Sequence, residues 1–145
     1  MILLITLAVV GVTTAAAVQA GARMGRRSAE EQLLIIGEEF QKALLSYGGG
    51  TLGAGPMELS ELLKDPRFPG IRRHLRRIYQ DPLTGSATWG LRRDPTGRIT
   101  GVYSLAPGVP IKRTGFGTSR NTFEEAQSYQ DWVFGLQSQN VRTLR

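Results

Sequence analysis

The feature that most constrains this fold is an apolar run that passes without a break into a charged, still periodic segment. Residues 2–22 read ILLITLAVVGVTTAAAVQAGA and contain no charged side chain. A helix needs about 20 apolar residues to span the hydrocarbon core of a bilayer, so the run is long enough. A buried core helix is a weaker alternative, because a soluble 145-residue domain could hardly surround so apolar a segment. We predict a membrane-spanning helix.

The second half of this run consists of small residues, which favours packing against other helices. Gly11 and Ala15 stand four residues apart, as do Ala16 and Ala20, and this spacing lets a second helix approach closely. We therefore predict that the run also serves as an assembly surface. The predicted membrane and assembly residues are Ile2, Leu3, Leu4, Ile5, Leu7, Val9, Val10, Gly11, Val12, Ala15, Ala16 and Ala20.

A cleavable signal peptide is the second alternative for the same run. Val18-Gln19-Ala20 has the small-x-small form of a cleavage site, but no Lys or Arg precedes the long apolar core. Under this alternative the mature chain starts near Arg23 and is an exported soluble enzyme.

The helical pattern continues past Arg23 and predicts one helix over residues 2–47. Apolar residues recur at steps of three and four, as expected for one face of a helix, at Leu33, Ile36, Phe40, Leu44 and Tyr47. The opposite face is assigned the charged residues Glu30, Glu31, Glu38, Glu39 and Lys42, with Glu38 and Lys42 as an i,i+4 pair. The run Gly48-Gly49-Gly50 supplies the end of the helix. Residues 23–47 are thus expected to lay an apolar stripe on a small domain.

Residues 48–145 are expected to form this small α+β body, ending in a polar tail. Short helices are predicted over residues 57–64 and about 71–78. The sequence DPTG at 94–97 predicts a tight turn between two strands, with Trp89 and Leu91 alternating on one and Ile99, Tyr103 and Leu105 on the next. Residues 131–136 are expected to add a closing strand to the antiparallel sheet.

The residues offer little for catalysis or metal binding. There is no cysteine, and the single histidine, His74, lies among arginines, which makes it a poor partner for an acid. Asp65, Asp81 and Asp94 each precede proline, where aspartate normally caps a turn. We predict a protein that is not an enzyme and has no cofactor. Calcium at the Asp-Pro loops is left open, although nothing approaches the oxygen spacing of an EF-hand.

The most basic stretch is RRHLRR, within a chain of formal charge +6. On a helix its four arginines would lie within about 140° and form one stripe. Nucleic-acid binding would call for neighbouring aromatic residues or a second basic element, and neither is evident, so we predict no nucleic-acid partner. The stripe is interpreted as a solvated face or a protein–protein interface, made of Arg72, Arg73, Arg76 and Arg77.

Four phrases in the body carry a family resemblance, in the order PMELSELLKDPR, FPGIRRHLRRIYQDPLTGSATWGL, GVYSLAPGVPIKRTGF and SYQDWVFGL. With the apolar helix ahead of them, they cover nearly the whole chain. The chain resembles a pseudopilin of the type II secretion or type IV pilus-like class, in its major-pseudopilin-like subfamily.

The resemblance implies a structural subunit, anchored in the bacterial inner membrane by one span, with its body in the periplasm. Such subunits are extracted into a filament whose core is made of packed apolar helices. The implied partners are copies of the chain, other pseudopilins, inner-membrane components of the secretion machine and lipid. The arginine stripe would meet acidic faces of neighbouring subunits. A membrane-anchored adaptor that forms no filament is the alternative.

Two features depart from the family pattern. The first acid of the printed sequence is Glu30, whereas the family has one a few positions into its helix, and the family's short basic leader does not precede Met1. Either the start as given lies inside the original helix or this branch is atypical. Moreover, Arg23, Arg26 and Arg27 follow the span, and the positive-inside tendency would keep the body in the cytoplasm. We follow the resemblance and expect a periplasmic body.

Overall fold

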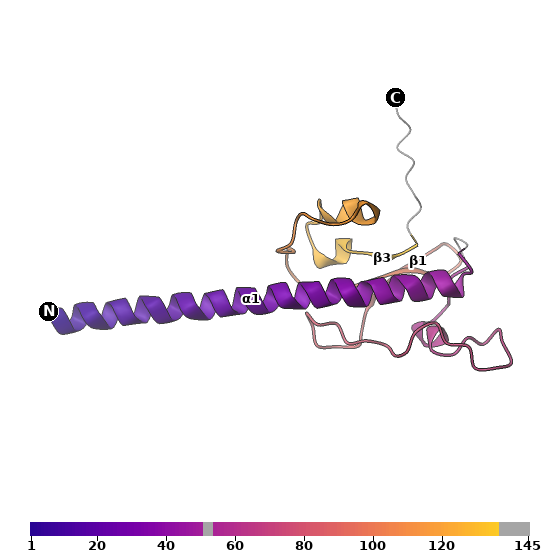
Figure 1. Ribbon diagram of the computed structural model, residues 1–145, viewed down its shortest axis with the longest axis horizontal. Coiled ribbons are helices and arrows are strands. Elements are labelled where there is room, and N and C mark those ends of the chain that lie inside the picture. Colours follow the sequence, from indigo (N-terminus) through magenta and orange to yellow (C-terminus); the bar gives the residue numbers. More distant parts are fainter. Residues whose placement is uncertain (51–53, 137–145) are drawn as a thin grey trace, which may run out of the picture.

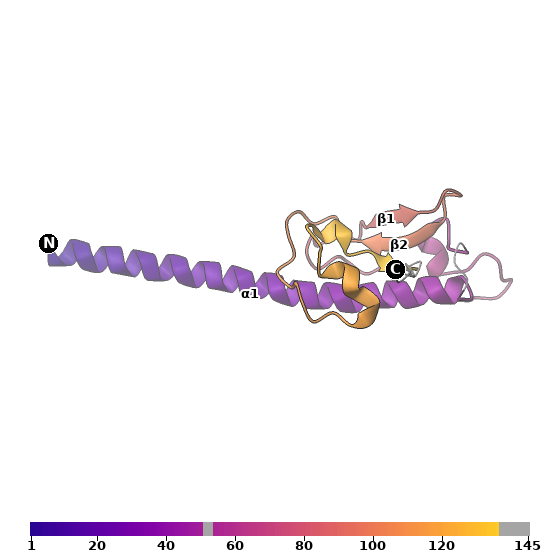
Figure 2. The same ribbon diagram turned by 90° about the horizontal axis from the view of Figure 1, so that it is seen from above.

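One long helix organises the whole molecule. The computed structural model describes residues 1–50 and 54–136, and of residues 6, 9–18, 118, 119 and 121 it describes the backbone alone. Helix α1 (Ile2–Tyr47) has 46 residues and is roughly 70 Å long at 1.5 Å per residue. Its C-terminal half is embedded in the body, and its N-terminal half projects from the body as an arm (Figures 1 and 2). The predicted continuous helix is confirmed.

The glycine run ends this helix as expected. The amide groups of Gly48 and Gly50 donate to the carbonyl oxygens of Leu44 and Leu45, both at 3.0 Å, which satisfies two of the last helical acceptors. Gly49 and Gly50 have φ of +60° and +82°, a conformation that residues with a Cβ rarely adopt. The chain therefore turns away from the helix axis at these positions.

The body is an α+β unit whose sheet has three antiparallel strands in the order β1-β2-β3. Strands β1 (Gly90–Arg93) and β2 (Ile99–Tyr103) form the predicted hairpin, with a bulge at Arg92/Arg93. Strand β3 (Phe134–Gly135) is the predicted closing strand, although it is only two residues long. Within the described residues, three short 3-10 helices complete the elements: η1 (Leu59–Leu62), η2 (Thr118–Phe123) and η3 (Tyr129–Asp131).

The core lies between the sheet side of the body and the predicted apolar stripe of α1. Leu33, Phe40 and Leu44 are fully buried, and Tyr47 is 4% exposed, which confirms the stripe at these positions, while Ile36 is half-buried. Phe40 meets Trp89 edge-on, with ring centroids 5.1 Å apart. A second aromatic group reaches the helix at Gly37, which Phe134 contacts; in this group Phe123 stacks on Trp132 and meets Phe134 edge-on. Aromatic residues of the body thus bury the C-terminal half of the helix.

The helix and the sheet approach so closely at one point that only glycine fits. A Cβ built on Gly37 would lie 2.2 Å from a ring carbon of Phe134 in β3. Nearby, the side-chain amide of Gln41 donates to the carbonyl oxygen of Gly135 at 3.2 Å. The short strand β3 is therefore held by the helix as well as by β2.

Four expectations need correction. Residues 71–78 form no helix, because the backbone there is held to η1 through hydrogen bonds from His74 and Leu75 to the carbonyl oxygen of Leu62. Residues 57–64 form only the 3-10 turn η1. In β2 the buried residues after Ile99 are Gly101 and Val102, so the predicted alternation fails: Tyr103 is half-buried, and Leu105 is exposed and lies beyond the end of the strand. Lys42 pairs with Glu39 instead of Glu38, whose carboxylate meets Arg120.

The predicted membrane span falls largely on residues whose side chains lie outside the described part. Among the described side chains, no helix is long and apolar enough to cross a membrane. The polar tail, residues 137–145, lies outside the described residues.

Candidate functional site

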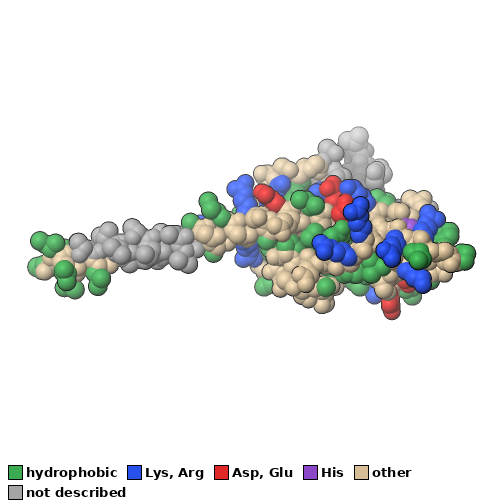
Figure 3. Space-filling model, turned by 60° about the horizontal axis from the view of Figure 1, so that its bottom comes forward, with side chains coloured by type: hydrophobic (Ala, Val, Ile, Leu, Met, Phe, Trp, Pro, Cys, Tyr) green, Lys and Arg blue, Asp and Glu red, His purple; other side chains and the backbone are tan. Residues whose placement is uncertain are grey.

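The arm of α1 exposes a set of large apolar side chains. Contiguous exposed apolar surface on a soluble monomer usually marks an interaction site. Gly21 and Gly25, farther along the arm, have open space where a Cβ would stand. Figure 3 shows hydrophobic side chains at the free end of the arm, and Lys and Arg side chains where the arm meets the body. Of the predicted assembly residues, the described large ones are 61–84% exposed: Ile2, Leu3, Leu4, Ile5 and Leu7.

The rest of the predicted assembly set is only partly described. Ala20 is exposed. The side chains at Val9, Val10, Gly11, Val12, Ala15 and Ala16 lie outside the described part of the chain, although the backbone there is helical.

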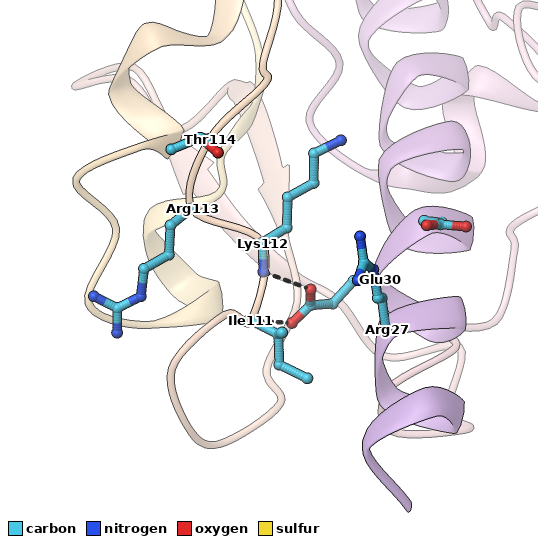
Figure 4. Close-up of a pocket in the computed structure, with 7 residues that line it drawn as sticks. Arg27, Glu30, Ile111, Lys112, Arg113 and Thr114 are labelled. Carbon is cyan, nitrogen blue, oxygen red and sulfur yellow. Dashed lines mark hydrogen bonds between the residues drawn. The ribbon is translucent and has the colours of Figure 1, made fainter. Parts of the chain in front are cut away.

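At the base of the arm a buried carboxylate ties the helix to the body. Glu30 is 0% exposed and accepts hydrogen bonds from the backbone amides of Ile111 at 2.6 Å and Lys112 at 3.0 Å. Its third partner is the hydroxyl of Tyr129, which donates to the same oxygen as Ile111. Figure 4 shows Glu30 reaching from the helix to the backbone of the neighbouring segment. Three donors thus replace the water that this charge would otherwise require.

Arg26, one turn before Glu30, completes this junction. Its Nε donates to the Tyr129 hydroxyl at 2.9 Å, and its Nη2 donates to the carbonyl oxygen of Pro107 at 2.9 Å. Burial and the hydrogen bond to Glu30 raise the pKa of Tyr129, while Arg26 opposes that shift. The tyrosine therefore stays protonated and keeps donating to Glu30.

Two hollows flank the helix at this base. One, of about 230 Å³, lies between the helix and residues 111–114, and Figure 4 shows its lining. The other, of about 400 Å³, lies between Gly25, Arg26 and Ala29 on the helix and the prolines Pro82 and Pro107. The first has three cations, Arg27, Lys112 and Arg113, around the engaged Glu30 and the exposed Glu31.

At the other end of the helix a second buried carboxylate, Asp65, fastens the loop before residues 72–77. Arg67 donates to both of its oxygens through Nε at 2.9 Å and Nη2 at 2.6 Å. The same guanidinium donates to the carbonyl oxygen of Tyr47 at 2.7 Å, and so places a cation at the helix C-terminus. Hydrogen bonds from Arg67 hold the pKa of Asp65 well below its usual range, although burial opposes that shift.

His74 belongs to this cluster, which corrects the expectation that it would be a poor partner for an acid. Its Nε2 lies 3.1 Å from Oδ2 of Asp65, and its Nδ1 lies 2.8 Å from the hydroxyl of Ser46. Because an ionised Asp65 can only accept, Nε2 carries a proton, and in the neutral ring Nδ1 accepts from Ser46. The His74 side chain is 1% exposed, so a substrate in solution does not reach it. The arrangement links the loop to the helix end.

The predicted arginine stripe takes a different form from the one expected. Arg72, Arg73, Arg76 and Arg77 are all exposed, but they lie on irregular backbone and not on a helix face. The Arg72 guanidinium stacks over Phe68 at 4.4 Å from the ring centroid, and that of Arg77 lies over Tyr79 at 5.2 Å. The four cations thus remain a basic surface segment, partly ordered by aromatic neighbours.

The sequence spacing indicates that Glu30 lies on the buried face of the helix, which corrects its predicted place on the opposite, charged face. Glu30 precedes Leu33 by three residues, and the buried positions continue at Gly37, Phe40 and Leu44, in alternating steps of three and four. Glu30 is therefore in phase with the buried face. No such signal exists for the contact between Asp65 and His74, because it depends on the path of a loop.

The described residues include no group of three or more His, Cys, Asp or Glu that could hold a metal ion. Comparisons of the chain with protein-family models, with curated proteins and with solved structures found no match.

Proposed function

We propose that this chain is a structural, pseudopilin-like subunit that assembles through its apolar N-terminal helix into a filament of a type II secretion or type IV pilus-like machine. In this proposal the arm is a single-pass anchor in the bacterial inner membrane, and the body lies in the periplasm. The role is mechanical and involves no cofactor.

One observation carries the proposal: a single helix in which one half is buried by the body, and the other half exposes large apolar side chains at the positions where its side chains are described. A helix exposed in this way needs either lipid or other helices to cover it. Filament assembly would supply both environments in turn, since helices that leave the bilayer can pack on one another. The small residues of the second half of the run favour such packing.

The junction at the base of the arm supports a mechanical role. Extraction of a subunit from a membrane would load the joint between the arm and the body. Glu30, Tyr129 and Arg26 connect the helix to two separate segments of the body through charge-assisted hydrogen bonds. Such bonds are roughly twice as strong as neutral ones.

The topology is tested first by adding a protease-cleavable tag after Arg145 and treating spheroplasts that express the full chain. Cleavage from outside, with the protein in the membrane fraction, is the expected result. Protection of the tag would place the body in the cytoplasm and overturn the proposal. It would also favour the positive-inside tendency of Arg23, Arg26 and Arg27.

Filament formation is tested separately, because a membrane-anchored adaptor would show the same topology. Chemical cross-linking of intact cells is expected to give a ladder of higher oligomers. The ladder should be lost on Leu7→Asp, since a charge on the arm opposes both lipid and helix contacts. A monomer band alone in the unaltered chain would favour the adaptor.

The basic segment is proposed to contact acidic faces of neighbouring subunits. Charge reversal at Arg73 and Arg76 is expected to shorten the cross-linked ladder while the protein stays in the membrane fraction. Both side chains are exposed, so the body should fold unchanged. An unaltered ladder would remove the basic segment from the interface.

A further inference from the structure

The surface around the base of the arm, formed by the helix and by residues 109–113 of the body, combines exposed apolar side chains with cations. We call this surface the shoulder. Pro107 accepts a hydrogen bond from Arg26, and a Cβ on Gly108 would meet the Arg26 guanidinium, so residues 107–108 lie against the helix. Farther along the same segment, the backbone amides of residues 111 and 112 donate to the Glu30 carboxylate of the helix. The shoulder consists of Met24, Val109 and Ile111, which are 75%, 43% and 45% exposed, and the cations Arg23, Arg27, Lys112 and Arg113.

The position of the shoulder along the helix matches the edge of a bilayer. Residues 2–22 give roughly 31 Å of helix at 1.5 Å per residue, close to the hydrocarbon thickness of about 30 Å. Arg26, which holds residues 107 and 108, lies four residues beyond Ala22, or roughly 6 Å farther along. That distance is about the depth of one headgroup layer. With the arm inserted, residues 107 and 108 would stand at the level of the lipid headgroups. Residues 111 and 112, held by Glu30 roughly 12 Å beyond Ala22, would stand at the outer edge of that layer.

The composition of the shoulder suits that layer. Apolar side chains next to Lys and Arg are typical of surfaces that sit at the boundary between headgroups and acyl chains. Around the first hollow, three cations, Arg27, Lys112 and Arg113, accompany one exposed carboxylate, Glu31, because the Glu30 carboxylate is already occupied by three donors. Arg23 adds a fourth cation one helical turn before Arg27. Near a membrane surface each Lys or Arg is attracted to anionic lipid.

We propose that the shoulder rests directly on the membrane that holds the arm, with Val109 and Ile111 among the lipid headgroups and the four cations against the phosphates of anionic phospholipids. The inference rests on the membrane insertion in the proposed function and adds a second, peripheral contact. That contact would fix the height and tilt of the body, and it would have to break when the subunit leaves the bilayer.

The absence of cysteine allows single-site labelling of the full chain. Ile111→Cys, labelled with an environment-sensitive fluorophore, is compared with Ile71→Cys, because Ile71 is also an exposed isoleucine (74%) but belongs to the loop at the other end of the helix. Leu4→Cys reports on insertion of the arm. Each protein is reconstituted into vesicles of phosphatidylcholine, with or without phosphatidylglycerol, that carry a bromolipid quencher.

The expected result is strong quenching at position 4, partial quenching with a blue shift at position 111, and neither at position 71. Phosphatidylglycerol should increase the quenching at 111 alone. If the label at position 4 is quenched but the label at position 111 emits as it does in water and is not quenched, the shoulder proposal fails while membrane insertion stands. If position 4 is not quenched, the membrane part of the proposed function fails as well.

The charged part is tested with Lys112→Gln and Arg113→Gln in the Ile111→Cys background. Each lost cation should weaken the preference for phosphatidylglycerol by about fivefold, while Arg72→Gln and Arg73→Gln should leave it unchanged. If the shoulder variants and the two control variants show the same preference for phosphatidylglycerol, the shoulder does not recognise the headgroups. If the label at 111 instead responds to protein concentration in detergent and ignores phosphatidylglycerol, the shoulder binds a second copy and the proposal is wrong.

Discussion

The two halves of α1 belong to one unbroken helix but differ in what holds them. The C-terminal half is fastened at both ends, by Glu30 at its start and by Asp65 and Arg67 at its end. Its apolar face is buried by aromatic residues between these points. In the N-terminal half, the large apolar side chains that the structure describes are more than 60% exposed. The body therefore depends on one half, and the other half is available for contacts outside the subunit.

This difference separates stability from assembly within a single element. Substitutions in the buried half should act on the unfolding of the body, whereas matched substitutions in the arm should act on association and leave the body intact. Trp89 and Trp132, the two tryptophans of the chain, are both buried in the body. Their fluorescence during denaturant unfolding in detergent thus reports on the body alone.

The largest effect is expected for Phe40→Ala. The ring is fully buried and touches Tyr79 and Trp89, so its removal leaves a cavity and should lower the free energy of unfolding by about 3–5 kcal/mol. Leu7→Ala, on the arm, should change it by less than about 0.5 kcal/mol. Equal losses in both variants, measured by tryptophan fluorescence, would show that the arm packs on the body.

The glycines of α1 provide a matched pair with opposite signs. Gly37→Ala puts a Cβ into the Phe134 ring and should destabilise the body by about 1–3 kcal/mol. Gly25→Ala meets open space and should stabilise the helix by about 0.5–1 kcal/mol, since alanine loses less backbone entropy. Helicity by circular dichroism and the unfolding midpoint measure the two effects. A stabilising Gly37→Ala would mean that β3 does not hold its place against the helix.

The long helix, its glycine stop and the hairpin were predictable because each depends on neighbours in sequence. The turn at Asp94 illustrates this, since the carboxylate accepts from the amides of Thr96 and Arg98 and Gly97 has φ of +85°. The missed features depend on distant partners. His74 follows the path of the loop to Asp65, and residues 71–78 give up helical hydrogen bonds for contacts with η1.

The candidate site divides in the same way. The apolar composition of the arm is visible in the sequence, and so is the basic segment at residues 72–77. The junction at Glu30 was assigned to the wrong face, because a carboxylate in phase with leucines was treated as a solvated charge. The donors to Glu30 come from residues 111, 112 and 129, more than 80 positions away, and contacts over such a separation cannot be predicted from sequence spacing.

Glu30→Gln should have the next effect in size. The amide keeps one acceptor but turns an NH₂ group toward donors, so at least one buried donor loses its partner, at about 2 kcal/mol. Glu31→Gln is the control, because Glu31 is the exposed neighbour. The free energy of unfolding measures the difference. Similar values for the two variants would mean that the junction adds nothing to the attachment of the buried half.

The smallest effect is expected at the other fastening, through pH. Because Arg67 lowers the pKa of Asp65 in the folded state, the folded chain holds this proton less tightly than the unfolded chain, whose Asp has a pKa of about 3.9. The stabilising effect of Asp65 is therefore complete above about pH 5 and is lost progressively as the pH falls through the unfolded pKa toward the lower folded pKa. Arg67 is 44% exposed, so solvent screens the pair and keeps the effect small.

Denaturant unfolding between pH 6 and pH 3 should show a shallower loss of stability in Asp65→Asn than in the unaltered chain. Glu124→Gln, which removes an exposed carboxyl, should follow the unaltered chain. Identical slopes in all three would show that Arg67 holds the end of the helix through Tyr47 alone, and the second fastening of the buried half would then lie in the backbone and not in the carboxylate.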